Sequence, residues 1–119
     1  MTDMLEFRGT IQHLPSLLDA AALRHRTISH NLANVNTPGY RRLDVNFEER
    51  LAAAIHSPSA GNIRAEITED NSGSARADGN NVDIDRELGE LNKNATLAQF
   101  YSQLIQSQFE TMRRAIEAP

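Results

Sequence analysis

The 119-residue chain contains no cysteine and no tryptophan. Without cysteine it can have neither disulfides nor thiolate metal ligands. It also lacks any run of about 18 apolar residues, so the sequence predicts no direct insertion into a membrane. The N-terminus does not combine a basic start with an apolar stretch, and we therefore expect no cleavable signal peptide.

An excess of basic residues is missing as well. The sequence has 16 acidic and 12 basic side chains, which argues against binding to a nucleic-acid phosphate backbone. Five arginines gather in the first half and are predicted to form a surface that is solvated or contacts another subunit. They are Arg24, Arg26, Arg41, Arg42 and Arg50.

The parts of a catalytic or metal site are not present together. His25 and His30 are five residues apart, which is not the i, i+4 spacing of a zinc-binding helix. Residues 78–83 follow a calcium loop only in part, since Val82 stands at a ligand position. No nucleophile triad or glycine-rich phosphate loop is found. We therefore expect no enzyme activity, no metal and no cofactor.

A helical pattern over residues of about 14–36 is the first positive signal. Its apolar positions alternate in steps of 4 and 3, which indicates one apolar helix face. Only His25 interrupts this face. The members are Leu14, Leu18, Ala21, His25, Ile28, Leu32 and Val35.

A turn is predicted where this helix ends. Pro38 cannot continue the helix, and Pro38-Gly39 fits the central positions of a type II turn with a positive φ at Gly39. Asn34 or Asn36 is expected to adopt the left-handed capping conformation.

A second helix is predicted over residues of about 83–117, with Asp83 or Asp85 as its cap. At about 1.5 Å per residue it would be on the order of 50 Å long. Its apolar series keeps the same 4, 3 alternation to the end of the chain. The series runs through Leu88, Leu91, Ala95, Ala98, Ser102, Ile105, Phe109, Met112 and Ile116.

The intervening arm, about 37–82, is irregular. Residues 47–55 are compatible with a short helix, residues 57–61 break the periodicity, and 63–67 alternate weakly, as in a short strand. We therefore predict an all-α single domain over 1–119, with long terminal helices pairing as an antiparallel coiled coil and an arm with at most short β-strands. Two helices alone leave apolar surface exposed to solvent, so we expect an isolated subunit to be only marginally stable.

The polar run Asn31–Tyr40 resembles the N-terminal signature of flagellar axial proteins, which are the rod, hook and hook-junction subunits. The matching positions are Asn31, Ala33, Asn34, Thr37, Gly39 and Tyr40. The resemblance extends to residues 23–26, 40–47 and the distant stretch 78–88. Because hook and distal-rod relatives carry large extra domains, the short chain is most similar to a proximal-rod subunit.

The resemblance implies a structural subunit of the periplasmic rod that polymerises helically into the proximal drive shaft. Its implied partners are copies of itself, other rod proteins, the adaptor between rod and membrane ring, and the type III export apparatus. The turn residues would fix where the arm leaves the helix; they are Asn31, Ala33, Asn34, Thr37, Pro38, Gly39 and Tyr40. The helix seam would carry assembly through Leu18, Ile28, Leu32, Leu88, Leu91, Ala95, Ala98, Ile105, Phe109, Met112 and Ile116.

Two other classes stay open. A soluble helical export chaperone or adaptor would also have paired amphipathic helices. A cell-wall hydrolase would need a pair of carboxylates in a rigid cleft, whereas the acidic residues here are predicted in the arm or at helix ends.

Overall fold

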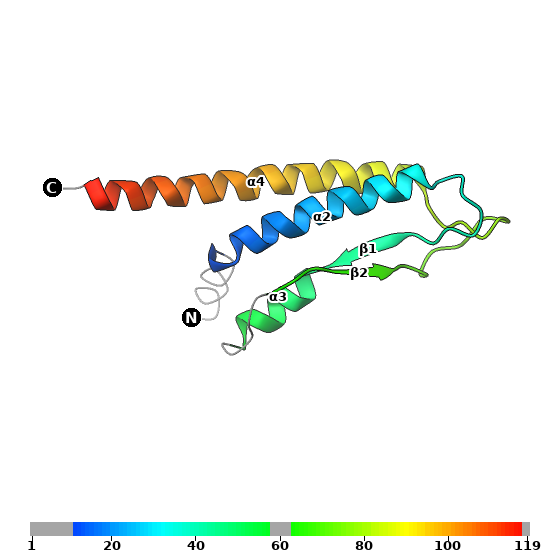
Figure 1. Ribbon diagram of the computed structural model, residues 1–119, viewed down its shortest axis with the longest axis horizontal. Helices are drawn as coiled ribbons and strands as arrows, with labels where there is room; N and C mark the ends of the chain where they lie inside the picture. The colour runs from blue at the N-terminus through cyan, green and yellow to red at the C-terminus, as the bar shows by residue number, and fades with distance from the viewer. Residues whose placement is uncertain (1–10, 58–62, 118–119) are drawn as a thin grey trace.

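Two long helices lie side by side and run in opposite directions in the computed structural model (Figure 1). The structure describes residues 11–57 and 63–117. Helix α2 spans Leu14–Ala33 and α4 spans Ile84–Glu117. The molecule is elongated, measuring 67 × 28 × 21 Å. The predicted contact between long N- and C-terminal helices is confirmed.

The termini of the helices follow from local sequence. Pro15 lies in the first turn of α2, where its missing N–H removes no helical hydrogen bond. The side chain of Asp83 accepts hydrogen bonds from the backbone N–H of Asp85 at 3.0 Å and of Arg86 at 3.4 Å. Asp83 therefore caps α4, as the sequence predicts.

The arm is more ordered than an extended linker. It contains strand β1 (Leu43–Asn46), helix α3 (Glu48–Ile55) and strand β2 (Glu66–Glu69). The strands pair antiparallel, with Leu43 opposite Glu69 and Asn46 opposite Glu66. Figure 1 shows the strands and α3 lying along α2, on the side away from α4. The predicted break at residues 57–61 falls mainly on residues outside those described.

The arm also contributes to the hydrophobic core, which the sequence analysis assigned to the two long helices alone. Phe47 and Leu51 pack against the buried residues Leu14, Leu17 and Ala20 of α2. Tyr101, Leu104 and Ile105 of α4 pack on the same cluster. Thus α3 closes a third side of a core that a helix pair could not enclose.

We predict that Phe47→Ala destabilises the chain by about 3–5 kcal/mol, because it leaves a cavity in the core that the arm shares with both long helices. Urea denaturation followed by circular dichroism would measure this loss. Phe100→Ala is the matched control, since Phe100 is exposed and its truncation should change stability much less. Equal effects of the two substitutions would contradict the prediction.

Candidate functional site

The side chain of Asn31 substitutes for a strand neighbour at the start of β1. It is fully buried, donates from Nδ2 to the carbonyl of Leu43 at 2.8 Å, and accepts from the Leu43 N–H at 2.9 Å. One carboxamide thus satisfies both backbone groups of a residue, as a β-ladder partner would. Asn31 therefore fixes β1 against the end of α2.

Tyr40 returns to the same asparagine after the turn. Its hydroxyl donates to Asn31 Oδ1 at 2.8 Å and lies 2.7 Å from Nδ1 of His30. Because the hydroxyl hydrogen is directed to Asn31, the His30 nitrogen must be the donor in the second contact. Burial, reinforced by the negative charge of Glu87, raises the pKa of Tyr40 above its ordinary value.

The predicted turn at the helix exit is confirmed. Gly39 has φ of 73°, and the N–H of Tyr40 donates to the Thr37 carbonyl at 3.2 Å. The expectation of a left-handed asparagine is wrong, because no non-glycine residue of the described segments has a positive φ. Asn34 instead caps with its side chain, whose Nδ2 donates to the His30 carbonyl at 2.8 Å. The side chain thus satisfies the terminal carbonyl without a backbone reversal.

Asn80 connects the second sequence motif to this turn. Its Nδ2 lies 2.9, 3.1 and 2.9 Å from the carbonyls of Asn34, Val35 and Thr37. Its Oδ1 accepts from the N–H of Val82 at 2.8 Å, and the side chain is fully buried. The two motifs that carry the family resemblance are therefore two halves of one hydrogen-bonded junction.

A buried ion pair lies beneath this junction. Glu87, in the first turn of α4, is 0% exposed and accepts from Nε of Arg42. Asn31 Nδ2 also lies 3.3 Å from Glu87, and Arg42 Nη1 donates to Asp70 at 2.9 Å. We call these four residues, Asn31, Arg42, Asp70 and Glu87, the polar cluster. It joins α2, the segment just before β1, the segment after β2, and α4.

The charges of the polar cluster support one another. Burial lowers the pKa of Arg42, but the hydrogen bond and charge of Glu87 outweigh it, so the pKa lies above its ordinary value. Side-chain and backbone hydrogen bonds from Ser72 lower the pKa of Asp70 from 3.8 to about 2; burial opposes this shift and Arg42 reinforces it. Arg42 and Asp70 are therefore ionised at neutral pH.

The sequence analysis missed the polar cluster. It placed Arg42 in a solvated or subunit-contacting group, whereas Arg42 is buried. The apolar pattern of the second helix did not single out Glu87. The signal available was its position: Glu87 falls on the α2-facing side of α4, seven residues before the buried Asn94.

The predicted helix seam is only partly inside the subunit. Ile28 is buried, and Leu18, Leu32, Leu91, Ala98 and Ile105 are partly buried. The rest of the α4 series is exposed: Leu88, Ala95, Phe109, Met112 and Ile116. Phe109 is 66% and Ile116 is 81% exposed. The face of α4 that touches α2 is rotated by one residue, since Glu87 and Asn94 occupy it, and an apolar stripe is left outside.

The turn residues divide in a similar way. Asn31 is buried and Asn34 and Tyr40 are partly buried, whereas Ala33, Thr37, Pro38 and Gly39 are exposed. The structure thus brings the asparagines and the tyrosine into the junction and leaves the tip of the turn on the surface.

Comparison with known proteins shows which family the chain resembles. A family model described as "Flagella basal body rod protein" matches residues 11–41. The chain is 26% identical to the flagellar basal body rod protein FlgB of Bacillus subtilis (strain 168), over 92% of the chain and 95% of the relative. It is 31% identical to FlgB of Aquifex aeolicus (strain VF5), over 79% of the chain and 82% of the relative.

The chain belongs to the FlgB family of flagellar basal body rod proteins. FlgB of Borrelia hermsii is a further relative, 28% identical over 84% of the chain and 90% of its own length. The predicted similarity to a short rod subunit is confirmed. The protein is accordingly a structural subunit of the flagellar basal-body rod and not an enzyme.

Two features are absent from the described residues. Within 11–57 and 63–117, no three histidine or acidic side chains are placed to hold a metal ion. In the same segments, none of the helices has the length and apolar character needed to cross a membrane.

We predict that Glu87→Gln lowers the free energy of unfolding by about 3–5 kcal/mol, because it leaves the buried Arg42 guanidinium without its closest counter-charge. Urea denaturation at neutral pH would measure the change. The exposed Glu49 provides the control Glu49→Gln, which should have little effect. A denaturation midpoint unchanged from the unsubstituted chain would show that the ion pair is not needed for folding.

The lowered pKa of Asp70 predicts acid sensitivity in a defined window. Between about pH 4 and pH 2 the carboxylate is protonated in the unfolded chain but still ionised in the folded one, so stability falls as pH falls. Asp70→Asn should remove this part of the pH dependence. Unfolding free energies measured from pH 2 to 7 would test it, with the exposed Asp19→Asn as control. Identical pH profiles for Asp70→Asn and the unsubstituted chain would count against the assignment.

Proposed function

We propose that this rod subunit polymerises helically with itself and with other rod proteins, through the apolar stripe that α4 leaves uncovered. The observation that supports this most directly is the exposure of Phe109, Met112 and Ile116. Together they line a shallow groove at the end of α4. Large apolar patches on a soluble chain mark interaction sites.

The position of the stripe fits an axial assembly. Helix α4 has 34 residues and α2 has 20, so α4 is longer by 14 residues, or about 21 Å. The exposed groove lies at the end of this extension, opposite the polar junction (Figure 1). A contact between one end of a subunit and a different surface of the next does not close on itself and generates a helical filament.

The finer features of the role belong to the same proposal. The subunit would lie in the proximal part of the periplasmic rod, next to the adaptor that joins the rod to the membrane ring. It would reach this place through the type III export apparatus without cleavage of a signal peptide. A monomer whose core is small and whose longest helix is half uncovered would pass unfolded through such a route and complete its packing on assembly.

An export chaperone or adaptor is the competing function. Such a protein would bury its apolar face against one soluble partner. The family membership supports the rod subunit, and so does the rigid junction between the motifs, which a chaperone would not need.

We predict that Phe109→Asp prevents rod completion, because it places an unpaired charge in the contact between subunits. Swimming in soft agar and the number of complete basal bodies would be measured in cells that depend on the variant. Since Phe109 is exposed, circular dichroism of the purified variant should match the unsubstituted chain. Thr111→Asp is the control, as Thr111 lies on the same turn but outside the groove. Normal swimming with Phe109→Asp would refute the assignment of this face.

A further inference from the structure

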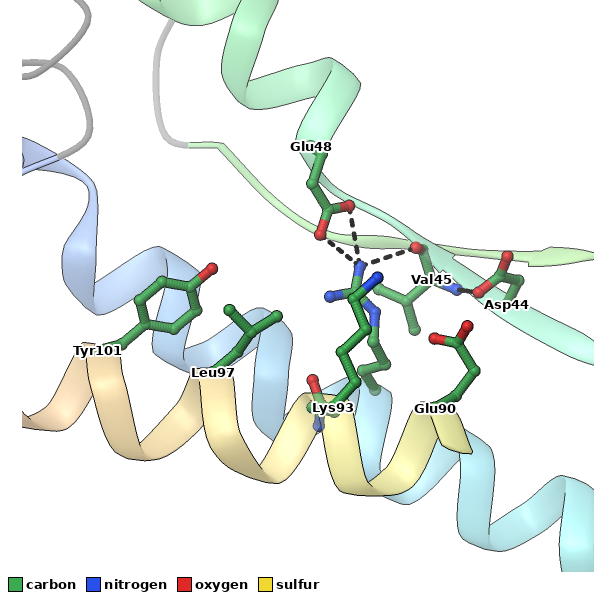
Figure 2. A pocket seen from close by; sticks show the side chains of 9 residues that line it. Asp44, Val45, Glu48, Glu90, Lys93, Leu97 and Tyr101 are labelled. Carbon is green, nitrogen blue, oxygen red and sulfur yellow. Dashed lines mark hydrogen bonds and ion pairs between the residues drawn. The ribbon is translucent and has the colours of Figure 1, made fainter. Parts of the chain in front are cut away.

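A second cavity lies between β1 and α4, far from the apolar groove. It has a volume of about 410 Å³, within the range of ligand-binding pockets. In Figure 2, Glu90 and Lys93 extend from α4, while Asp44, Val45 and Glu48 lie on the opposite side and Leu97 and Tyr101 continue along the helix. We call this cavity the acidic socket.

One buried acceptor in the socket is unsatisfied. Asn94, 3% exposed, lines the cavity and donates from Nδ2 to the Ala21 carbonyl at 2.7 Å. Its Oδ1 is the single buried side-chain oxygen or nitrogen in the described residues with no hydrogen-bond partner. Because Nδ2 is held by Ala21, the oxygen is the group left for an incoming donor. A buried acceptor of this kind is stabilised by a ligand that carries N–H groups.

The charges around the socket indicate that the ligand is a cation. Arg24 is already paired with Glu48 at 2.8 Å and bonded to the Val45 carbonyl at 3.2 Å. The remaining charged groups are the carboxylates of Asp44 and Glu90 and the ammonium of Lys93, so negative charge is in excess. Among the described residues Glu90 forms no ion pair, and the one ion pair of Asp44 is a 3.7 Å contact with Arg42. Asp44 Oδ1 also accepts a hydrogen bond from the Val45 N–H at 2.9 Å.

A side chain suits this site better than a metal ion. The described residues hold no group of three acids or histidines close enough to coordinate a metal. A guanidinium is planar and carries five N–H donors, so it can reach separate carboxylates and an amide oxygen at the same time. Leu97 and Tyr101 add an apolar wall against which the stem of an arginine can pack.

The chain itself carries a matching surface at the end of α4. Arg113 lines the exposed groove beside Phe109 and Met112 and forms no ion pair with the described residues. It therefore presents a cation flanked by apolar side chains, whereas the socket presents carboxylates flanked by apolar side chains. Within one subunit the two cannot meet, because 23 residues of helix separate Arg113 from Glu90, about 35 Å.

We propose that the acidic socket receives Arg113 from a second copy of this chain, where the guanidinium binds between Asp44 and Glu90 and donates to Asn94. This contact rests on the proposed polymerisation and specifies it: the end of α4 in one copy docks on the middle of α4 in the next. The two surfaces are different, as a helical assembly requires.

Charge exchange tests the contact. Glu90→Arg and Arg113→Glu should each reduce the number of complete basal bodies about tenfold or more, since like charges then face each other. The double variant Glu90→Arg/Arg113→Glu should restore them, because every socket again meets an opposite charge. Arg114→Glu is the control: it makes the same charge change one residue away, outside the groove, and should not rescue Glu90→Arg.

The outcomes separate the possibilities. If Arg113→Glu restores assembly to the Glu90→Arg variant and Arg114→Glu does not, the contact between copies is supported. Loss of assembly without restoration would overturn it, and would point to another protein as the source of the cation. Normal assembly with Glu90→Arg would also overturn it, while failure of Phe109→Asp in the same assay would leave the proposed polymerisation intact. Circular dichroism would show whether each purified variant is folded. If Glu90→Arg is unfolded, the milder Glu90→Gln takes its place. Normal assembly with Glu90→Gln would again overturn the contact.

Discussion

The buried pair of Arg42 and Glu87 is the constraint on which the rest of the subunit depends. Moving two ions out of water is costly, and their attraction compensates only when the remaining hydrogen-bonding positions are also filled. Here Asn31 and Asp70 fill them. The four side chains come from α2, from the segment just before β1, from the segment after β2 and from α4, so the cluster is complete only when all four segments are in place. The polar cluster therefore acts less as a source of net stability than as a condition on the geometry: the arm must leave α2 at one angle for the charges to be satisfied.

Around this pair, side-chain amides form the hydrogen bonds to backbone groups that neighbouring strands or helix turns form elsewhere. Asn31 pairs both backbone groups of Leu43, and the Nδ2 of Asn80 lies within hydrogen-bonding distance of three carbonyls in the turn after α2. A helix exit and a strand start normally leave such groups to water. In this subunit the fully buried side chains of Asn31 and Asn80 bond to them, while the small apolar core around Phe47 lies toward the other end of α2. The molecule thus has a hydrogen-bonded polar junction at one end and exposed apolar side chains at the other.

This division explains what could be predicted from the sequence. Apolar periodicity and turn chemistry are local signals, and they located both long helices, the cap at Asp83 and the turn at Gly39. The positions of buried polar groups are not local, because Glu87 and Asn94 are identified only by what they meet on α2 and β1. The apolar stripe therefore predicted a seam rotated from the one that α2 contacts. The short helix and strand of the arm were visible as patterns, but their packing on the core was not, since two strands of four residues each carry little signal.

The rotation of the seam is informative in its own right. The contact of α4 with α2 combines the partly buried Leu91, Ala98 and Ile105 with the hydrogen bonds of Glu87 and Asn94. The other apolar residues of the α4 series face outward. Polar contacts specify orientation, while apolar area supplies non-directional attraction. The subunit thus uses polar groups where its own two helices must adopt one register, and leaves part of its apolar area uncovered. Under the proposed polymerisation a neighbouring subunit would bury this uncovered area, so the exposure that leaves one subunit incompletely packed is also what would hold the rod together.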